Sequence, residues 1–498
     1  MKHSSTSPFL LFAALLYLAC AVSSASAQET DLMDLNLEDL LKVEVVSSAS
    51  RYEQSLSDAP SSVTIVTRKD IQTFGYRTMA ELINGVRGFY VTNDTNYSHT
   101  GVRGFGRPSD FDTRLLVLLN GHRLNDSIYA SSLFGLDFMI DIDLVEQVEI
   151  VRGPSSSVYG TNAFFGVINI VTRKPDDVGL EVSSDIEKHD TYQERVSYGE
   201  SFENGIELLA SFTRFDSHGQ DFYFPEFDAP ETNNGIANNL DGEDGYSAYL
   251  QLSFEDFTIS SGMVDRNKDV PAAPFETLFN DPIFTTQDQR FFIDAKYSTQ
   301  LSEGTQFETR LFYDWYEYRG YYPYDYAEEE DEDPFYVTNK DFSRGERIGA
   351  QANVILTSVE NNKIVVGTEA REVFNIDQTN VDVDPAYTYL DSFENETIWA
   401  LYAQDEITLT DWATLHVGLR FDDYESIDSE ISPRAGLIFH PSDSSNLKFL
   451  YGQAFRAPNA FELYYNDAET QKAPQNLKPE KIDTWEFVYE QQLDKNVR

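Results

Sequence analysis

Alternation of apolar and polar residues with a period of two dominates the chain after Pro175. From Tyr246 to Phe254 alternate side chains are apolar or aromatic, and Ser247, Gln251 and Ser253 share the opposite face. Successive side chains of a strand point to opposite faces, so this pattern predicts strands with one apolar and one polar face. Further strand-like runs lie at 307–315, 401–409, 415–421, 437–439 and 447–451, with Phe312 the one apolar residue on the polar face of its run.

A membrane could hold such a chain only as a closed barrel. No segment after the N-terminal stretch offers the roughly 18 consecutive apolar residues that a spanning helix needs, and only helices and closed barrels satisfy every backbone group in lipid. The runs approach the ~10 residues of a tilted membrane strand, and short turns such as 360–362 alternate with long acidic connections such as 224–244. A soluble sandwich also alternates. The lengths and connections favour a mainly β protein with a transmembrane antiparallel barrel.

Charge and composition exclude several other classes. The chain carries 84 acidic and 37 basic residues, a formal net charge of −47, whereas nucleic-acid binding needs clustered Lys and Arg. Aromatic residues make up 14%, too many for a disordered acidic chain. There is no phosphate-cradling Gly-Lys-Ser/Thr and no His-Glu-x-x-His. We therefore expect no nucleic-acid partner, and an enzyme is the least supported class.

The N-terminus has the features of a secretory signal peptide at 1–27. Lys2 precedes an apolar run from Phe9 to Val22, and Ala25-Ser26-Ala27 is a small-residue cleavage pattern. A lipoprotein cut before Cys20 is the alternative, although Tyr17 fits poorly upstream. Cys20 is the only cysteine, so cleavage before Gln28 leaves no disulfide. Residues 28–42 then form a short acidic periplasmic leader.

Residues 43–176 predict a compact mixed α/β domain. A strand is expected at Val63 to Thr67, and Thr78 with Glu81 forms a capping box ahead of a one-face helix. Leu115 to Leu119 followed by Asn120-Gly121 predicts a hairpin with a two-residue turn. Residues 177–498 form the barrel region.

Residues 142–174 read IDLVEQVEIVRGPSSSVYGTNAFFGVINIVTRK. This stretch resembles the end of the plug domain of TonB-dependent outer-membrane receptors of the siderophore-receptor kind. Similar motifs lie at 58–60, 63–67, 102–105, 119–121, 401–405, 418–422, 455–458 and 476–480. The resemblance implies an N-terminal plug inside a barrel of about 22 strands. Because residues 177–498 supply only about fourteen strand candidates, we expect the barrel to be C-terminally incomplete.

The resemblance implies TonB-dependent active transport of a scarce ligand by a monomer in the outer membrane of a Gram-negative bacterium. The implied partners are TonB with its inner-membrane energising complex, outer-membrane lipid and a small-molecule metal chelate. A ferric siderophore is the expected ligand because it is the commonest class in the family, with cobalamin, haem or an oligosaccharide as alternatives. Residues 459–475 lack the histidine of the family's haem receptors. From other classes, a passive channel or an adhesin remains, but neither has a use for a plug.

Residues Val43, Glu44, Val45, Val46 and Ser47 resemble the TonB box, the energy-coupling segment of the family. An extended segment with alternating apolar residues suits pairing by strand addition. The alternative interpretation is an ordinary first strand of the plug.

A lock between plug and barrel is expected from Arg103, Arg152 and Glu486. In the family, arginines in motifs like Arg103-Gly104-Phe105 and Arg152-Gly153-Pro154 pair with glutamates on the inner wall, and Glu486 matches one of these by its place after Pro479-Glu480. The parity of the last strand agrees. Trp485, Phe487 and Tyr489 make its apolar face, so Glu486 must point into the lumen. We expect Glu486→Ala to loosen the plug more than Glu490→Ala.

Ligand contacts are expected from plug loops and an aromatic outer loop, because their donors and rings suit a polar chelate. The candidates are Asn93, Asn96, Tyr97, His99, Arg107, Tyr322, Tyr324 and Tyr326. Loops without ligand contact are the alternative. Six acids at 328–333 could bind calcium, but a solvated loop is favoured. No resident cofactor and no metal site are expected, since no two histidines lie at metal-ligand spacing.

Overall fold

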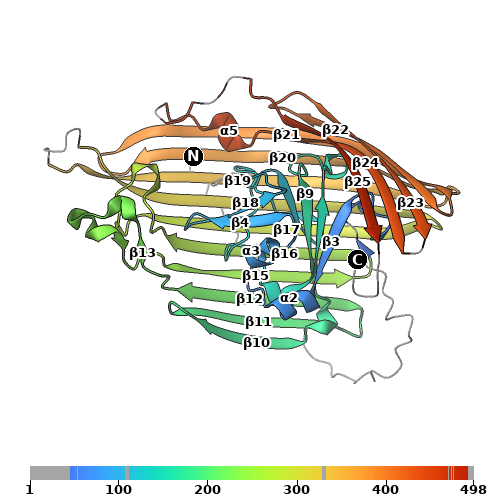
Figure 1. Cartoon of the computed structure of the whole chain (residues 1–498), viewed down its shortest axis with the longest axis horizontal. Helices are drawn as coiled ribbons and strands as arrows, with labels where there is room; N and C mark the ends of the chain where they lie inside the picture. The colour runs from blue at the N-terminus through green and yellow to red at the C-terminus, as the bar shows by residue number, and fades with distance from the viewer. Residues whose placement is uncertain are drawn as a thin grey trace.

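The computed structural model describes residues 45–46, 48–52, 54–106, 111–327, 333–442, 444–468, 470–472, 474 and 476–491. The expected signal peptide and leader, together with Val43, Glu44, Ser47 and Arg107, lie outside these ranges. The described chain forms a small N-terminal domain and one large curved sheet (Figure 1). We call the small domain the plug and the large sheet the wall.

The wall has fourteen strands in sequence order, and every neighbouring pair is antiparallel. This agrees with the predicted number and direction of the strands. The strands are β10 (Leu180–Glu187), β11 (Thr191–Ser201), β12 (Ile206–Ser217), β15 (Glu243–Phe254), β16 (Phe257–Asp269), β17 (Thr285–Ser302), β18 (Thr305–Asp325), β19 (Tyr336–Leu356), β20 (Asn362–Asp382), β21 (Tyr387–Thr410), β22 (Ala413–Tyr424), β23 (Glu430–Ser442), β24 (Ser445–Arg456) and β25 (Glu480–Gln491). Within the described chain, β10 and β25 form the two edges and do not pair with each other.

Connections at the two ends of the wall differ in length. Tight turns join β15 to β16 and β17 to β18, whereas 25 residues, 218–242, separate β12 from β15 and contain the hairpin of β13 (Phe222–Tyr223) and β14 (Ile236–Ala237). In outer-membrane barrels the short turns face the periplasm and the long loops face outward. We therefore call the two ends of the wall periplasmic and outer.

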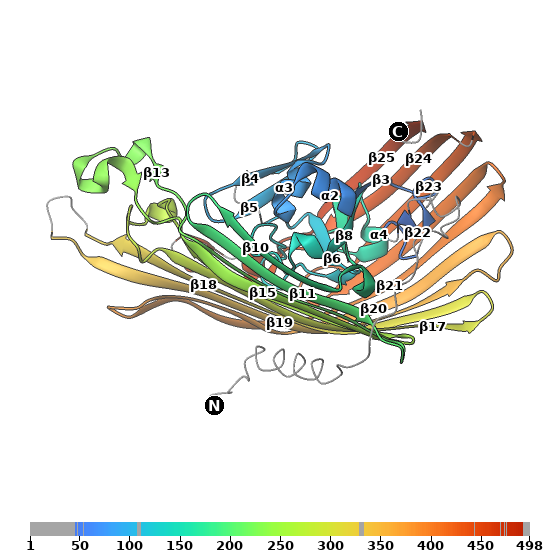
Figure 2. The same cartoon turned by 90° about the horizontal axis from the view of Figure 1, so that it is seen from below.

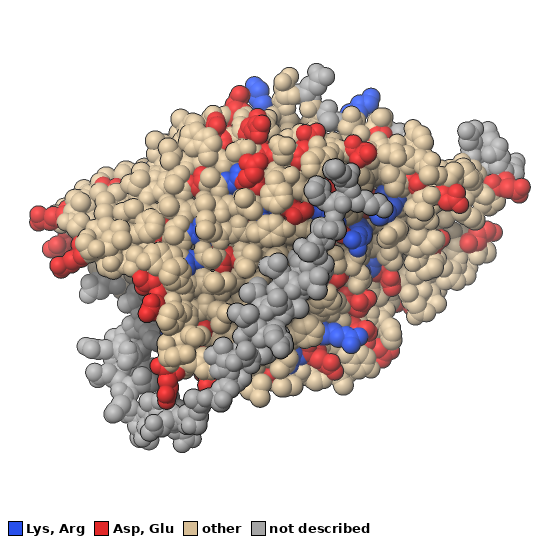
Figure 3. All heavy atoms as spheres, turned by 180° about the vertical axis from the view of Figure 1, so that it is seen from behind, with Lys and Arg blue, Asp and Glu red and all other residues tan. Residues whose placement is uncertain are grey.

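The convex face of the wall is apolar. In β25 the outward face carries Trp485, Phe487 and Tyr489, which are 80%, 62% and 58% exposed, after two charged residues at the start of the strand, and the residues between the aromatic ones are half-buried on the concave side. Uncharged side chains cover most of the middle of this face, and acidic side chains stand mainly around its margins, including the left and right ends (Figure 3). The predicted parity of the last strand is therefore confirmed.

The plug lies against the concave face of the wall (Figure 2). Its five-stranded sheet has the order β3-β8-β9-β6-β7, in which only the β6–β9 pair is parallel. These strands are β3 (Ser62–Thr67), β6 (Leu115–Leu119), β7 (His122–Arg123), β8 (Val145–Arg152) and β9 (Gly166–Thr172). Two small pairs join β1 (Val45–Val46) to β2 (Gln54–Ser55), and β4 (Phe89–Asn93) to β5 (Ser98–Val102). The expected Asn120-Gly121 hairpin is present between β6 and β7.

The part of the chain that the structure describes has four short α-helices, α2 (Arg68–Phe74), α3 (Met79–Asn84), α4 (Ser156–Tyr159) and α5 (Ala460–Tyr464). Short 3₁₀ turns lie at Ile142–Leu144, Pro175–Asp177, Pro225–Phe227, Pro230–Gly235 and Pro274–Glu276. None of the helices in the described ranges is long and apolar enough to cross a membrane.

The expected capping box at Thr78 is only half formed. The Thr78 hydroxyl accepts a hydrogen bond from the Glu81 amide, but the Glu81 carboxylate turns to the amide and guanidinium of Arg77 instead of the N-cap amide. The complete capping box belongs to α2, between Thr67 and Asp70. A cation one residue before the cap therefore competes for the carboxylate that the motif requires.

The plug core continues into the wall. Leu82, Ile83, Leu144 and Val148 are fully buried in a cluster that also contains Leu209, Tyr249, Val264 and Phe292 of the wall. The other face of the plug sheet packs Leu116, Leu118 and Val167 with Ala59 and Val158. Buried apolar side chains thus pack against both faces of the plug sheet.

Replacing Leu116 with Ala should open the plug sheet locally. Leu116 is fully buried, and deleting such a side chain costs about 2–5 kcal/mol because a cavity remains. We expect faster amide hydrogen exchange in β6 and β9, by about two orders of magnitude for ~3 kcal/mol. Phe74→Ala, at a ring that is 68% exposed, is the control and should leave exchange unchanged.

Candidate functional site at the plug and wall interface

The first segment of the plug is clamped by two cations of the wall. The Lys448 ammonium is fully buried and donates to the carbonyls of Leu56, Ala59 and Ser61 at 3.2, 2.9 and 3.4 Å. Arg434 donates to the Ala49 carbonyl at 3.0 Å and to the Ser61 hydroxyl at 2.7 Å. Backbone carbonyls that would otherwise be buried without donors are thereby satisfied.

The described part of the TonB-box-like segment is a short strand of the plug. Val45 pairs with Ser55, and Val46 pairs with Gln54. The segment is therefore extended, as strand addition requires, and its present partner is the chain's own next segment. The coupling role itself stays a prediction, and Val43, Glu44 and Ser47 lie outside the described ranges.

Arg103 and Glu486 meet between the plug and the wall. The Arg103 guanidinium, at the turn after β5, forms an ion pair with the Glu486 carboxylate on the inner face of β25. Gly153 lies against the same carboxylate, since a Cβ at this position would be 3.3 Å from Oε1 of Glu486. Because φ is +100° at Gly153, glycine suits both the backbone and the space.

Arg152 does not take the expected place in an ion pair. In the part of the chain that the structure describes, its guanidinium donates to the Thr64 hydroxyl at 2.8 Å and to the Arg87 carbonyl at 3.1 Å. The register of β3 with β8 places Arg152 opposite Ser62, so its side chain crosses the plug sheet. Arg152 thus stabilises the plug internally, beside Glu486 but without pairing with it.

Four predicted ligand residues lie on the β4–β5 hairpin, and their side chains already have partners in the protein. The Tyr97 hydroxyl donates to Asp288 on the wall at 2.7 Å, and the ring lies under the Arg266 guanidinium at 5.2 Å. The Asn96 side-chain oxygen accepts from Thr286 at 3.1 Å and from Arg266 at 3.3 Å. These two residues fasten the hairpin to the wall.

His99 and Asn93 organise the hairpin itself. The buried His99 ring contacts the Asp94 carboxylate at 2.9 Å. Burial opposes the charged carboxylate, but hydrogen bonds from His99 and from the amides of Tyr97 and Asn96 lower the pKa of Asp94. The Asn93 side chain accepts from the Thr95 amide at 2.7 Å. A role of these residues in ligand binding stays a prediction.

Tyr322, Tyr324 and Tyr326 extend along β18 and just beyond it at the outer end. The Tyr322 hydroxyl is 2.5 Å from that of Tyr318, and Tyr324 stacks on Tyr326 with ring centroids 5.6 Å apart. Each of the three side chains therefore contacts another tyrosine at this end of the wall. Arg107, the remaining candidate, lies outside the described ranges.

The segment between β24 and β25 folds inward over the plug. The Asn459 side chain donates to the Tyr129 carbonyl at 2.8 Å, and the Phe461 amide donates to the Ile128 carbonyl at 3.2 Å. The Phe461 ring packs against the rings of Tyr129 and Phe111 at 5.5 and 5.7 Å. Helix α5 and the residue before it thus contact the plug at Phe111, Ile128 and Tyr129.

His122, the first residue of β7, is a buried plug residue enclosed by side chains of the wall. Its ring stacks on Phe292 at 4.5 Å and meets Phe312 edge-on at 5.5 Å, which explains the one apolar residue on the polar face of β18. Its Nε2 is 2.7 Å from the Asp314 carboxylate, and its Nδ1 is 3.7 Å from Asp294. Burial opposes protonation, but the two carboxylates outweigh it and raise the pKa of His122.

Several interface residues were missed at the sequence level. Lys448, Arg434 and Arg420 lie on wall strands with their charges on the plug side, and Arg420 donates to the Val158 carbonyl at 3.2 Å. The available signal was a cation on the polar face of an alternating strand, as in Leu447-Lys448-Phe449. The described residues hold no group of three or more His, Cys, Asp or Glu that could bind a metal.

A plug held by polar contacts inside a curved wall with an apolar outer face defines a plugged outer-membrane receptor. Family models agree: residues 55–167 match the TonB-dependent receptor plug domain, and residues 228–496 match the β-barrel of TonB-dependent receptors. The chain belongs to the TonB-dependent receptors, proteins of the bacterial outer membrane.

Curated relatives and solved structures are similar to this chain in sequence and in fold, respectively. The vitamin B12 transporter BtuB of Vibrio vulnificus is 22% identical over 96% of this chain and 71% of its own length. An iron-regulated outer membrane virulence protein of Vibrio cholerae is 30% identical over 26% of this chain and 20% of its own length. The FpvAI structure in complex with pyocin S2 superposes with a TM-score of 0.68 at 14% identity, over 91% of this chain. The ferric yersiniabactin receptor FyuA of Yersinia pestis gives 0.64 at 16% identity, over 88% of this chain and 71% of its own. The chain spans 62% of the FpvAI chain.

Glu486→Ala should loosen the plug. Removing the carboxylate leaves Arg103 without its ion-pair partner, and because Arg103 is 43% exposed we expect about 1–2 kcal/mol, less than for a fully buried pair. Small-solute conductance in planar bilayers should rise.

Glu490 is not a neutral control for this variant, because its carboxylate lies 3.3 Å from the Lys448 ammonium that clamps the plug. The expectation that Glu490→Ala leaks less than Glu486→Ala therefore loses its basis. Asp483→Ala, on the outward face of the same strand, is the matched control. Equal leak from the Glu486 and Asp483 variants would contradict the lock.

Attachment of the β6–β7 turn should depend on pH through His122. Its raised pKa means that the ion pairs stabilise the folded state fully below the unfolded pKa of ~6.5 and lose this effect as pH rises through the folded-state value. His122→Gln should therefore speed amide exchange of residues 117–123 most at pH 5.5 to 6.5, and less above the raised pKa. A difference between the two proteins that grows with pH would refute the assignment.

Proposed function

We propose that this chain forms the plug-bearing part of a transporter that takes up a ferric siderophore across the outer membrane, driven by TonB. The observation that carries the proposal is the docked plug. A passive channel gains nothing from a domain that fills its lumen side, whereas a gated transporter requires one. The energy source follows from the family and from the extended segment at Val45–Val46.

The weakness of the pairing between β1 and β2 supports a coupling role for the first segment of the plug. Among the described residues two pairs, Val45 with Ser55 and Val46 with Gln54, join the strands, and a backbone hydrogen bond contributes about 0.5–1.5 kcal/mol net. A partner strand that offers more pairs could therefore replace Gln54–Ser55 at small cost. Pulling on the segment would then act on residues 48–61, which Lys448 and Arg434 hold.

Structures that superpose on this chain include FpvA bound to pyoverdines and the ferric yersiniabactin uptake receptor FyuA, and this makes a ferric siderophore the first candidate. Cobalamin is the second candidate, because the vitamin B12 transporters match nearly the whole chain in sequence. Identities of 14–25% support the fold alone, so the ligand must be tested directly. Uptake of ⁵⁵Fe on a panel of siderophores, beside ⁵⁷Co-labelled cyanocobalamin, separates the two in cells with and without TonB.

Val45→Pro should abolish uptake while ligand binding persists. Proline lacks the backbone N–H that strand pairing uses, so we expect transport to fall at least about tenfold. Val45→Ile keeps the donor and the β-branched side chain and serves as the control. Binding of the labelled ligand to whole cells is measured in parallel. Full uptake by the proline variant would remove the coupling role from this segment.

A further inference from the structure

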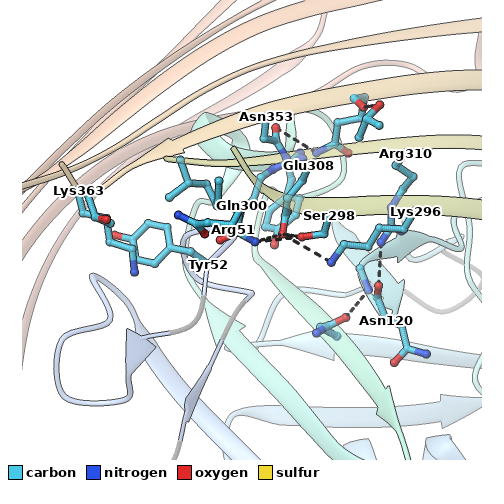
Figure 4. Close-up of a pocket in the computed structure, with 18 of the residues that line it drawn as sticks. Arg51, Tyr52, Asn120, Lys296, Ser298, Gln300, Glu308, Arg310, Asn353 and Lys363 are labelled. Atoms are coloured by element: carbon cyan, nitrogen blue, oxygen red, sulfur yellow. Dashed lines mark hydrogen bonds and ion pairs between the residues drawn. The ribbon is translucent and has the colours of Figure 1, made fainter. Parts of the chain in front are cut away.

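A cavity of about 660 Å³ lies between the plug and the periplasmic end of the wall. Its wall side is built from the ends of β17 and β19 and from the starts of β18 and β20, with Gly304 and Thr357 at the short turns. Its plug side is built from Arg51, Tyr52, the Asn120-Gly121 turn and β9. The side chains of both domains converge on this space (Figure 4).

The charge of this lining is opposite to that of the chain. Four cations line the cavity, namely Arg51, Lys296, Arg310 and Lys363, against the single carboxylate of Glu308. The whole chain has more than twice as many acids as bases. Glu369 and Asp294 pair with Arg51 and Arg310 from behind the lining, so the positive excess at the cavity is smaller than this count, but its sign favours anions over cations.

Lys296 and Arg310 are direct cross-strand neighbours in the β17–β18 register. Like charges placed opposite each other are destabilising. The carboxylates nearest to them compensate only in part: Glu308 lies 3.7 Å from the Lys296 ammonium, and Asp294 lies 3.5 Å from Nε of Arg310. These are ion pairs at or beyond the limit of hydrogen bonding, so an anion between the two cations would relieve their repulsion.

Arg310 also carries an unsatisfied donor. Its Nη2 donates to the Asn120 carbonyl at 2.9 Å, but Nη1 is buried and has no hydrogen-bond partner in the described chain. A buried donor without a partner is costly, and a guanidinium that turned this donor towards the cavity could hold an oxyanion with two parallel hydrogen bonds. Gly121 lies against this group, since a Cβ there would be 3.3 Å from Nη2.

We propose that this cavity binds a small organic molecule that carries a carboxylate or phosphate group, with Lys296 and Arg310 at the anionic group and Lys363 at the opposite rim. The volume is that of an organic ligand and exceeds what a lone inorganic ion fills. The Lys363 ammonium lies 3.6 Å from the Tyr52 ring centroid, which leaves an aromatic face beside the charge for the rest of the molecule. The site is independent of the ligand that is bound at the outer end.

The test uses the full chain purified in detergent and isothermal titration calorimetry. The probes are glucose 6-phosphate and citrate, with glucose as the neutral match for the phosphate. The double variant Lys296→Gln/Lys363→Gln removes two positive charges. The Lys296 side chain is 40% exposed, so its replacement does not disturb the core. Lys340→Gln, near the outer end of β19, is the control for loss of charge on the same sheet.

We expect glucose 6-phosphate, citrate or both to bind, glucose not to bind, and affinity to fall about tenfold or more in the double variant but not in Lys340→Gln. Binding of only one anionic probe would identify phosphate or carboxylate as the group recognised. Three results would overturn the site: no binding of either anion, equal binding of glucose, or unchanged affinity in the double variant. Because transport is not measured, failure here leaves the proposed uptake function untouched.

Discussion

The rest of the structure depends on strands that have one apolar and one polar face. A wall with Trp485 and Phe487 on one face and Glu486 on the other can lie in a bilayer only if its polar face is turned inward and filled. Curvature of the sheet follows from this constraint, and so does the need for a domain on its concave side. The plug supplies that domain, with an apolar core that reaches Phe292 of the wall and a rim of polar contacts.

Polar contacts make this interface both specific and releasable. The Lys448 ammonium and the Arg434 guanidinium satisfy carbonyls of the plug segment, and stripping one partner from such buried contacts costs far more than the net free energy that the contact contributes. A continuous apolar seal would instead have to be exposed to water during any displacement. Tyr97 and Asn96 attach the outer hairpin in the same way, so the plug is held at both ends by groups that water can solvate.

The aromatic residues have different roles at the two ends of the wall. At the outer end, the Phe461 ring of α5 packs on Tyr129 and Phe111 of the plug, which also stack on each other. In the middle, Phe292 and Phe312 enclose His122 and place an imidazole between two carboxylates. At the periplasmic end, Tyr52 stands beside Lys363 and Arg51 at a cavity rich in positive charge.

The sequence by itself determined the alternating strands, their number, the Asn120-Gly121 hairpin and the inward direction of Glu486, because each follows from local periodicity, turn chemistry or a contiguous motif. It could not determine which partner each charge takes. Arg152 stands in a family motif, yet it forms its hydrogen bonds within the plug. Tyr97 donates a hydrogen bond to Asp288, about 190 residues away. Glu490 forms an ion pair with Lys448, which holds the plug segment. Only the tertiary structure decides such pairs, because register and docking bring together side chains whose separation along the chain carries no local signal.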